Sequence, residues 1–160
     1  MIKNIIEEIT QDPAFVEGLA WKKVDFDTNH YIFKEGEVGG SIFFIVTGEL
    51  RVISNVELEN HKHIHAGFWD LKAGDVFGEM ALHETQTRSA NVMGLTQGSL
   101  YELDGERLSI YLDANPIKGY LFYKYLFELI SEKLKHSNHR VNSLFAWGMK
   151  IHEIDKEIVD

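Results

Sequence analysis

The sequence contains no cysteine among its 160 residues, and basic residues are scarce. Without cysteine the chain cannot form a disulfide, a thiolate zinc site or a Cys-ligated iron–sulfur cluster. Its 16 Lys and Arg residues are outnumbered by 25 Asp and Glu residues, which gives a formal net charge of −9. Phosphate contacts along a nucleic acid need clustered Lys and Arg, so this balance argues against a nucleic-acid-binding surface.

Long apolar runs are missing as well. The N-terminal stretch MIKNIIEEITQD is interrupted by Lys3, Glu7 and Glu8, and it lacks the apolar core of a signal peptide. The most apolar later stretch, residues 120–130, contains Lys124 and Glu128 and is too short to span a bilayer. We therefore expect a cytoplasmic protein without a membrane partner.

The motifs of several enzyme classes are also absent. The sequence has no G-x-S-x-G elbow for a nucleophilic serine and no P-loop for nucleotide triphosphates. At 44% hydrophobic and 26% charged residues it has the composition of an ordinary globular domain. We expect a single domain over residues 1–160 that is not an enzyme and has no cofactor.

Apolar spacing predicts three regions in this domain. Residues 1–20 show a helical rhythm broken by Pro13, which indicates short helices. Residues 21–108 change to short alternating stretches separated by glycine turns, which predicts an antiparallel β-roll or jelly-roll. Asp104 is a good helix N-cap, and residues 109–160 are expected to be helical with one break near Asn115-Pro116. The predicted fold class is thus mainly β with flanking helices.

One stretch of the β region, FGEMALHETQTRSANV at residues 77–92, combines groups that suit an anion and a sugar hydroxyl. Gly78 permits a sharp turn, and the following residues predict one helical turn whose free N–H groups, near Ala81 and Leu82, suit a phosphate. The positive charge of Arg88 can neutralise a phosphate, and its guanidinium can donate two hydrogen bonds to it. Ser89 adds a hydroxyl donor. Glu79 could accept a hydrogen bond from a ribose hydroxyl.

This stretch, which we call the cassette, resembles the phosphate-binding cassette of the cyclic nucleotide-binding domain family. The resemblance rests on the residues Phe77, Gly78, Glu79, Ala81, Leu82, Arg88, Ala90 and Val92. It implies that the ligand is cAMP or cGMP. Thr87 stands where many members have proline, and Asn91 stands where a small residue is usual.

The C-terminal region resembles the long dimer helix of the catabolite activator protein group. Apolar residues recur there at alternating steps of four and three, with two interruptions, in the series Ile130, Leu134, Ser137, Val141, Leu144, Gly148 and Ile151. Such a heptad seam predicts a homodimer, although a helix packed along its own domain would give the same stripe. The resemblance also implies that Ser137 and Asn138 reach the purine of the ligand.

The same group carries a helix-turn-helix domain after this helix, and the acidic residues 148–160 do not match one. Nor do we expect a fused kinase or channel in these 160 residues. The signal is therefore expected to pass through the dimer or through a separate effector protein.

Two other interpretations remain open. The chain could be a degenerate β-roll that binds no nucleotide and acts as a protein-interaction or dimerisation module. Alternatively, His61, His63 and His65 would share one face of a strand and could bind a transition metal. Their surroundings faintly resemble the first metal motif of the cupins, which would make the chain a metalloenzyme using His63 and His65. The second cupin motif has no counterpart, so no metal site is predicted.

Overall fold

The strands of the protein begin where the helical spacing of its apolar residues ends. The computed structural model describes residues 2–58, 62–82 and 86–151. In chain order the elements are α1 (Ile2–Thr10), β1 (Trp21–Phe26), β2 (Tyr31–Phe33), β3 (Val38–Gly39), β4 (Ser41–Thr47), β5 (Glu49–Leu58), β6 (Lys62–Lys72), β7 (Val76–Phe77), the 3₁₀ turn η1 (Glu79–Leu82), β8 (Gln86–Thr87), β9 (Asn91–Gly94), β10 (Gly98–Asp104), α2 (Gly105–Ala114) and α3 (Pro116–Ile151).

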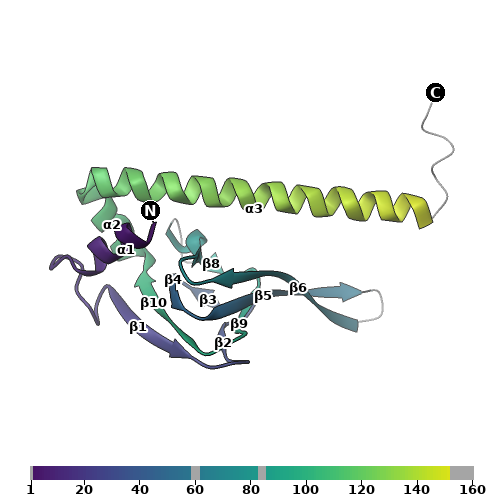
Figure 1. The fold of residues 1–160 in the computed structure, drawn as a ribbon, viewed down its shortest axis with the longest axis horizontal. Helices are drawn as coiled ribbons and strands as arrows, with labels where there is room; N and C mark the ends of the chain where they lie inside the picture. The colour runs from purple at the N-terminus through teal and green to yellow at the C-terminus, as the bar shows by residue number, and fades with distance from the viewer. Residues whose placement is uncertain (1, 59–61, 83–85, 152–160) are drawn as a thin grey trace. The chain divides into compact units, whose positions relative to one another are not determined.

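The strands form an antiparallel β-roll, which confirms the predicted fold class. One sheet has the order β1-β10-β4-β7, a second has the order β2-β9-β5-β6, and β3 pairs with β8 alone (Figure 1). The hairpin of β5 and β6 is long, because its pairing continues from Glu49 opposite Lys72 to Leu58 opposite Lys62. Strand β8 and the end of β7 belong to the cassette, and their pairing with β3 and β4 positions it in the roll.

The core of the roll lies between the two larger sheets. It is built from side chains on the inward face of each strand, as alternation along a half-buried strand requires. Its buried members are Phe26, Phe43, Ile45, Leu50, Leu71, Phe77, Val92 and Leu100. Three phenylalanine rings meet at the cassette end of this core: Phe43 stacks on Phe77 at 4.9 Å, and Phe33 lies 5.6 Å from Phe43.

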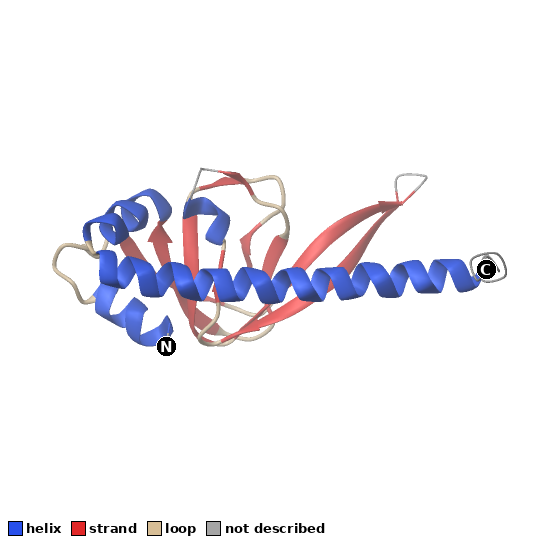
Figure 2. Ribbon diagram, turned by 90° about the horizontal axis from the view of Figure 1, so that it is seen from above, coloured by secondary structure: helices blue, strands red, loops and turns tan. Residues whose placement is uncertain are grey.

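The helices follow the sequence signals with two differences. Residues 2–20 contain one α-helix where several short helices were expected, and the C-terminal helices begin at Gly105 rather than at residue 109, because Asp104 caps α2. In α1 the buried residues Ile2, Ile5, Ile6 and Ile9 follow helical spacing. The Asp104 carboxylate accepts the Arg107 N–H at 2.8 Å, which confirms it as the N-cap of α2. Helix α2 ends at Ala114, and α3 begins at Pro116 and continues as one helix of 36 residues (Figure 2). Proline favours this first helical position because its missing N–H would have no partner there.

A polar network connects the last turn of α2 and the first turn of α3 to the chain after α1. The Tyr111 hydroxyl donates to an Asp12 carboxylate oxygen at 2.5 Å, and the Lys118 ammonium contacts the same oxygen at 3.1 Å. These partners lower the pKa of Asp12 to about 2, with the Tyr111 hydrogen bond as the largest cause. The network therefore favours the ionised form of Asp12.

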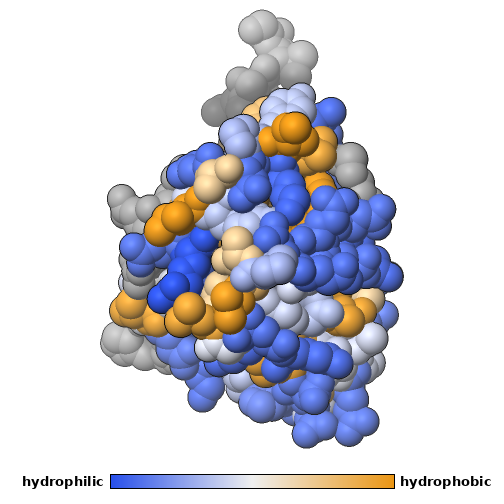
Figure 3. All heavy atoms as spheres, turned by 90° about the vertical axis from the view of Figure 1, so that its left-hand side faces the viewer, coloured by the Kyte–Doolittle hydropathy of each residue, from blue (hydrophilic) through white to orange (hydrophobic). Residues whose placement is uncertain are grey.

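The chain divides into two compact units, Met1–Gly119 and Tyr120–Asp160. The first holds the β-roll with α1 and α2, and the second holds most of α3. Among the described residues, no helix is long and apolar enough to cross a membrane. On the face drawn in Figure 3, apolar residues form separate small patches between hydrophilic ones.

Candidate functional site

The cassette begins with the sharp turn and the short helical turn that its sequence predicts. Gly78 has a φ of +73°, a conformation that a side chain would strain, and η1 follows directly. The Ala81 N–H donates to the Gly78 carbonyl at 3.1 Å, so it would have to be shared with an anion or released. Ala81 and Leu82 are buried, whereas Glu79 is half-buried. The start of η1 therefore has a fixed position in the roll.

The backbone of Arg88 is fixed by two hydrogen bonds to the turn before β3. Its N–H donates to the Glu37 carbonyl at 2.8 Å, and its carbonyl accepts the Gly36 N–H at 2.9 Å. Next to it, Val38 pairs with Thr87 in the short β3–β8 ladder. These bonds hold Arg88 beside Gly78 although ten positions separate the two residues in the sequence.

The Arg88 side chain is half-buried and points back toward Gly78. Its Nη2 donates to the Ser41 carbonyl at 2.9 Å, and its Cζ lies 4.3 Å from the centre of the Phe33 ring. A Cβ added at Gly78 would lie 3.1 Å from Nη1. The structure thus brings Gly78, with the adjoining η1, and the Arg88 guanidinium together, as the cassette interpretation requires.

The electrostatics around Arg88 show two opposing effects. Burial lowers the pKa of the Arg88 guanidinium, while the carboxylates of Glu102 and Glu37 raise it. A guanidinium stays protonated near neutral pH in spite of such a shift. Partial burial also weakens the screening of its charge, which strengthens its attraction for an anion.

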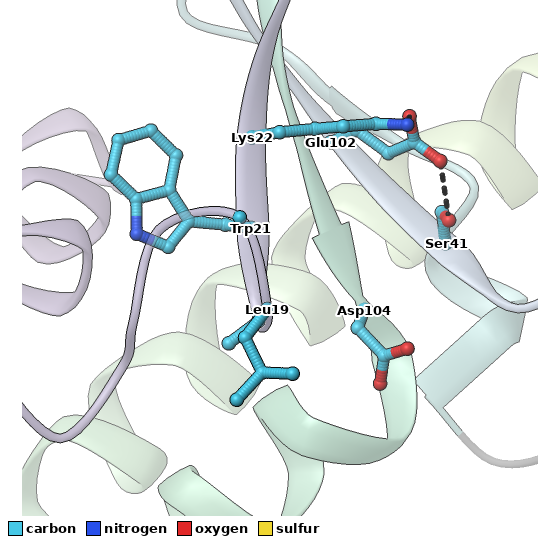
Figure 4. Close-up of a pocket in the computed structure, with 8 residues that line it drawn as sticks. Leu19, Trp21, Lys22, Ser41, Glu102 and Asp104 are labelled. Carbon is cyan, nitrogen blue, oxygen red and sulfur yellow. Dashed lines mark hydrogen bonds and ion pairs between the residues drawn. The ribbon is translucent and has the colours of Figure 1, made fainter.

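Ser41 connects Arg88 to a small polar cavity on β1. Its carbonyl accepts from Arg88, while its hydroxyl donates to the Glu102 carboxylate at 2.8 Å (Figure 4). The Lys22 ammonium pairs with the other Glu102 oxygen at 3.1 Å. The cavity, of about 200 Å³, is lined in part by Trp21 and by these three side chains. Glu102 therefore already has two partners, which hold its charge near Arg88.

The structure gives the positions of three further predicted site residues but does not test their roles. Ser89 follows Arg88 and is exposed. Ser137 and Asn138 lie on α3, in the second unit, and are also exposed. Their contact with a purine stays a prediction.

The structure adds three residues to the site that the sequence analysis did not single out: Phe33, Gly39 and Ser41. Each lies against the Arg88 side chain from a strand distant in sequence. Only Gly39 carried a signal, as one of the glycines that separate the short alternating stretches of residues 21–108. Asn91, an unusual residue for the cassette, is buried, and its side chain accepts the Glu35 N–H at 2.9 Å. Asn91 thus supports the loop that leads to Glu37.

The structure does not describe the side chains of the three histidines considered for a metal site. His61 lies outside the described residues, and so do the side chains of His63 and His65, although the backbone of both belongs to β6. Among the residues whose side chains are described, no group of three His, Asp or Glu residues could hold a metal ion.

Comparisons with known proteins identify the family of this chain. The family model of the cyclic nucleotide-binding domain matches residues 23–115. The cGMP-dependent protein kinase egl-4 of Caenorhabditis elegans is 35% identical over 74 residues, which make up 46% of this chain but 9% of the kinase.

Solved structures of related proteins share the fold of this chain. Cyclic-AMP-bound PfPKA-R is 29% identical with a TM-score of 0.52, covering 68% of this chain and 34% of that one. The catabolite activator protein of Thermus thermophilus shares the fold, with 20% identity and a TM-score of 0.62 over 83% of this chain and 63% of its own. The matched β-roll contains the whole cassette, and the chain belongs to the cyclic nucleotide-binding domain family.

Proposed function

We propose that this domain senses cAMP or cGMP and holds the ribose–phosphate part of the ligand in the cassette. The observation that carries the proposal is the half-buried Arg88 guanidinium, fixed beside Gly78 in a chain of this family. In this proposal Arg88 and Ser89 bind the cyclic phosphate, together with the backbone N–H groups near Ala81 and Leu82. Gly78 allows the ligand to approach the backbone closely.

Glu79 is proposed to accept a hydrogen bond from the ribose 2′-hydroxyl. A carboxylate next to an anion site repels the anion, so its presence there needs a separate task such as this one. It lies at the start of η1, directly after Gly78.

Replacing Glu79 with alanine should weaken cyclic nucleotide binding by about 1–3 kcal/mol, the scale of a lost hydrogen bond to a charged group. Calorimetric titration would measure the change. The matched comparison uses the 2′-deoxy form of the nucleotide, which lacks the proposed partner. Glu79→Ala and the 2′-deoxy ligand should show non-additive losses, and fully additive losses would contradict the contact.

The proposed response to the ligand is a movement of the C-terminal helix, which the sequence predicts from Asn115 to Trp147. This helix would act as a lid over the base and shift between two arrangements. A ligand that is not chemically changed by the protein can signal only if it binds one conformation more tightly than the other. Ser137 and Asn138 are proposed to contact the purine, which would give the ligand such a preference. The role of the domain is then regulatory, and its cytoplasmic location and its effector protein stay predictions from the sequence.

We also propose that α3 forms a homodimer through its heptad seam. The seam side chains that the structure describes are exposed in the chain, with Leu134 and Val141 each 60% and Leu144 67% exposed. Apolar side chains at heptad spacing gain stability when a second helix covers them.

Sedimentation of the purified protein should therefore give a dimer that Leu134→Glu together with Val141→Glu converts to a monomer. Asn142→Glu, one position off the seam, is the control that should leave the dimer intact. A wild-type monomer at high protein concentration would refute the dimer without affecting nucleotide binding.

One observation supports the alternative of a module without a nucleotide. The contacts of Arg88 with Ser41 and Phe33 give this residue a structural task in the roll. A chain that had lost its ligand could keep Arg88 for that task alone. Titration of the nucleotide-stripped wild-type protein with cAMP and cGMP separates the two functions.

A further inference from the structure

The Arg88 guanidinium lies over an aromatic ring from a distant strand. Its Cζ is 4.3 Å from the centre of the Phe33 ring and 5.4 Å from that of Phe43. Both distances fall within the range of about 6 Å in which a cation is attracted to a ring face. Phe33 ends β2, where it pairs with Val92 of β9, four residues after Arg88. The ring is therefore fixed by the sheet before any ligand binds.

A glycine also limits the space around the guanidinium. A Cβ built at Gly39 would lie 2.5 Å from Arg88 Nε and 2.6 Å from Nη2. The guanidinium thus fills the space that any other residue at position 39 would occupy. The Arg88 side chain is long and could adopt many rotamers. The space at Gly39 and the hydrogen bond from Nη2 to the Ser41 carbonyl hold it in one orientation.

From this arrangement we propose that Phe33 is a positioning residue of the anion site, and that its ring preorganises Arg88 for the ligand phosphate. The inference rests on the proposed function of Arg88. A long arginine side chain loses rotamer freedom when it is held in one orientation, and a ligand that binds to an already ordered arginine does not bear that entropic cost. The partial burial of Arg88 strengthens the attraction between cation and ring.

A purely structural role for Phe33 is the competing explanation, because its ring also packs against Phe43 and Phe77. Two variants separate the explanations. Phe33→Leu keeps an apolar side chain but removes the ring face, whereas Phe33→Tyr keeps the ring. Phe44→Leu is the control for the loss of a core ring. Phe44 lies on β4, is 3% exposed and stacks on Tyr101 at 6.2 Å, and its side chain leaves the strand on the opposite face from that of Phe43.

The test measures the dissociation constants of cAMP and cGMP for these variants by calorimetry. Phe33→Leu should weaken binding roughly three- to thirtyfold, the range of a cation–ring attraction, while Phe33→Tyr should stay within about twofold of the wild type. Phe44→Leu should lower the melting temperature without weakening binding. Gly39→Ala, which keeps Phe33 but displaces the guanidinium, should also lower affinity.

A second readout needs no ligand. The Arg88 Nε–H resonance in the nucleotide-free protein should be shifted by the ring current of Phe33 in the wild type and in Phe33→Tyr. This shift should become smaller in Phe33→Leu, where only the more distant Phe43 ring, 5.4 Å from Cζ, remains. Wild-type affinity in both Phe33→Leu and Gly39→Ala would overturn the positioning role alone. If the wild type bound neither nucleotide, the proposed function itself would fail, and the preorganisation for a phosphate would fail with it.

Discussion

Replacing Arg88 with alanine should abolish tight binding of cAMP and cGMP. The variant loses the charge that neutralises the cyclic phosphate and up to two charge-assisted hydrogen bonds, each worth about 1.5–3 kcal/mol. Binding should therefore weaken by at least a hundredfold, which corresponds to about 3 kcal/mol. Calorimetric titration of the variant against both nucleotides would measure this loss.

The variant also loses the contacts of Arg88 with Ser41 and Phe33, so its fold has to be checked by circular dichroism and thermal unfolding. Arg51→Ala is a suitable control, because Arg51 lies on β5 and pairs with Asp70 at 2.6 Å, outside the cassette. Arg51→Ala should bind with wild-type affinity. Undiminished affinity in a folded Arg88→Ala protein would rule out the assigned site.

Replacing Gly105 with alanine should destabilise the protein by about 3 kcal/mol, the upper end of the range for an overpacked site. Gly105 is the buried first residue of α2, and its N–H donates to the Gly40 carbonyl at 2.8 Å. An added Cβ would lie 2.5 Å from the Ala81 carbonyl oxygen and 2.7 Å from that of Gly40. Both are backbone atoms, so the collision cannot be relieved by a side-chain rotation, and η1 has to move.

For a chain of this size the loss corresponds to a drop of roughly 6–12 °C in melting temperature. Nucleotide affinity should fall as well, because Ala81 belongs to the proposed phosphate site. Glu106→Ala, at the next and exposed position of α2, should change the melting temperature by no more than about 2 °C. A Gly105→Ala protein with the wild-type melting temperature would show that α2 and η1 are not packed as described.

Most of the fold could be predicted because the relevant signals are local. The isoleucine spacing of α1, the Asp104 cap and the Asn115-Pro116 break each act within a few residues, and the structure confirms all three. The short turn of η1 was also predictable from its position after Gly78. Such patterns depend on backbone geometry that the nearby residues determine.

The surroundings of Arg88 could not be predicted in the same way. Phe33, Gly39 and Ser41 meet its side chain only because β2, β3 and β4 come together in the folded roll. In the sequence these residues lie 55, 49 and 47 positions before Arg88, and no periodic pattern links them to it. From the sequence alone, Phe33 would be predicted to be an ordinary aromatic residue of the core. Its position over a charged group depends on tertiary packing.

The measurement that tests the central claim most directly is calorimetric titration of the purified, nucleotide-stripped wild-type protein with cAMP and with cGMP. The account predicts binding at micromolar or lower concentration for at least one of the two, and the tighter one would identify the natural base preference. Neither heat nor a thermal shift at millimolar concentrations of both nucleotides would contradict it. That result would favour a β-roll whose Arg88 is retained for its contacts with Ser41 and Phe33.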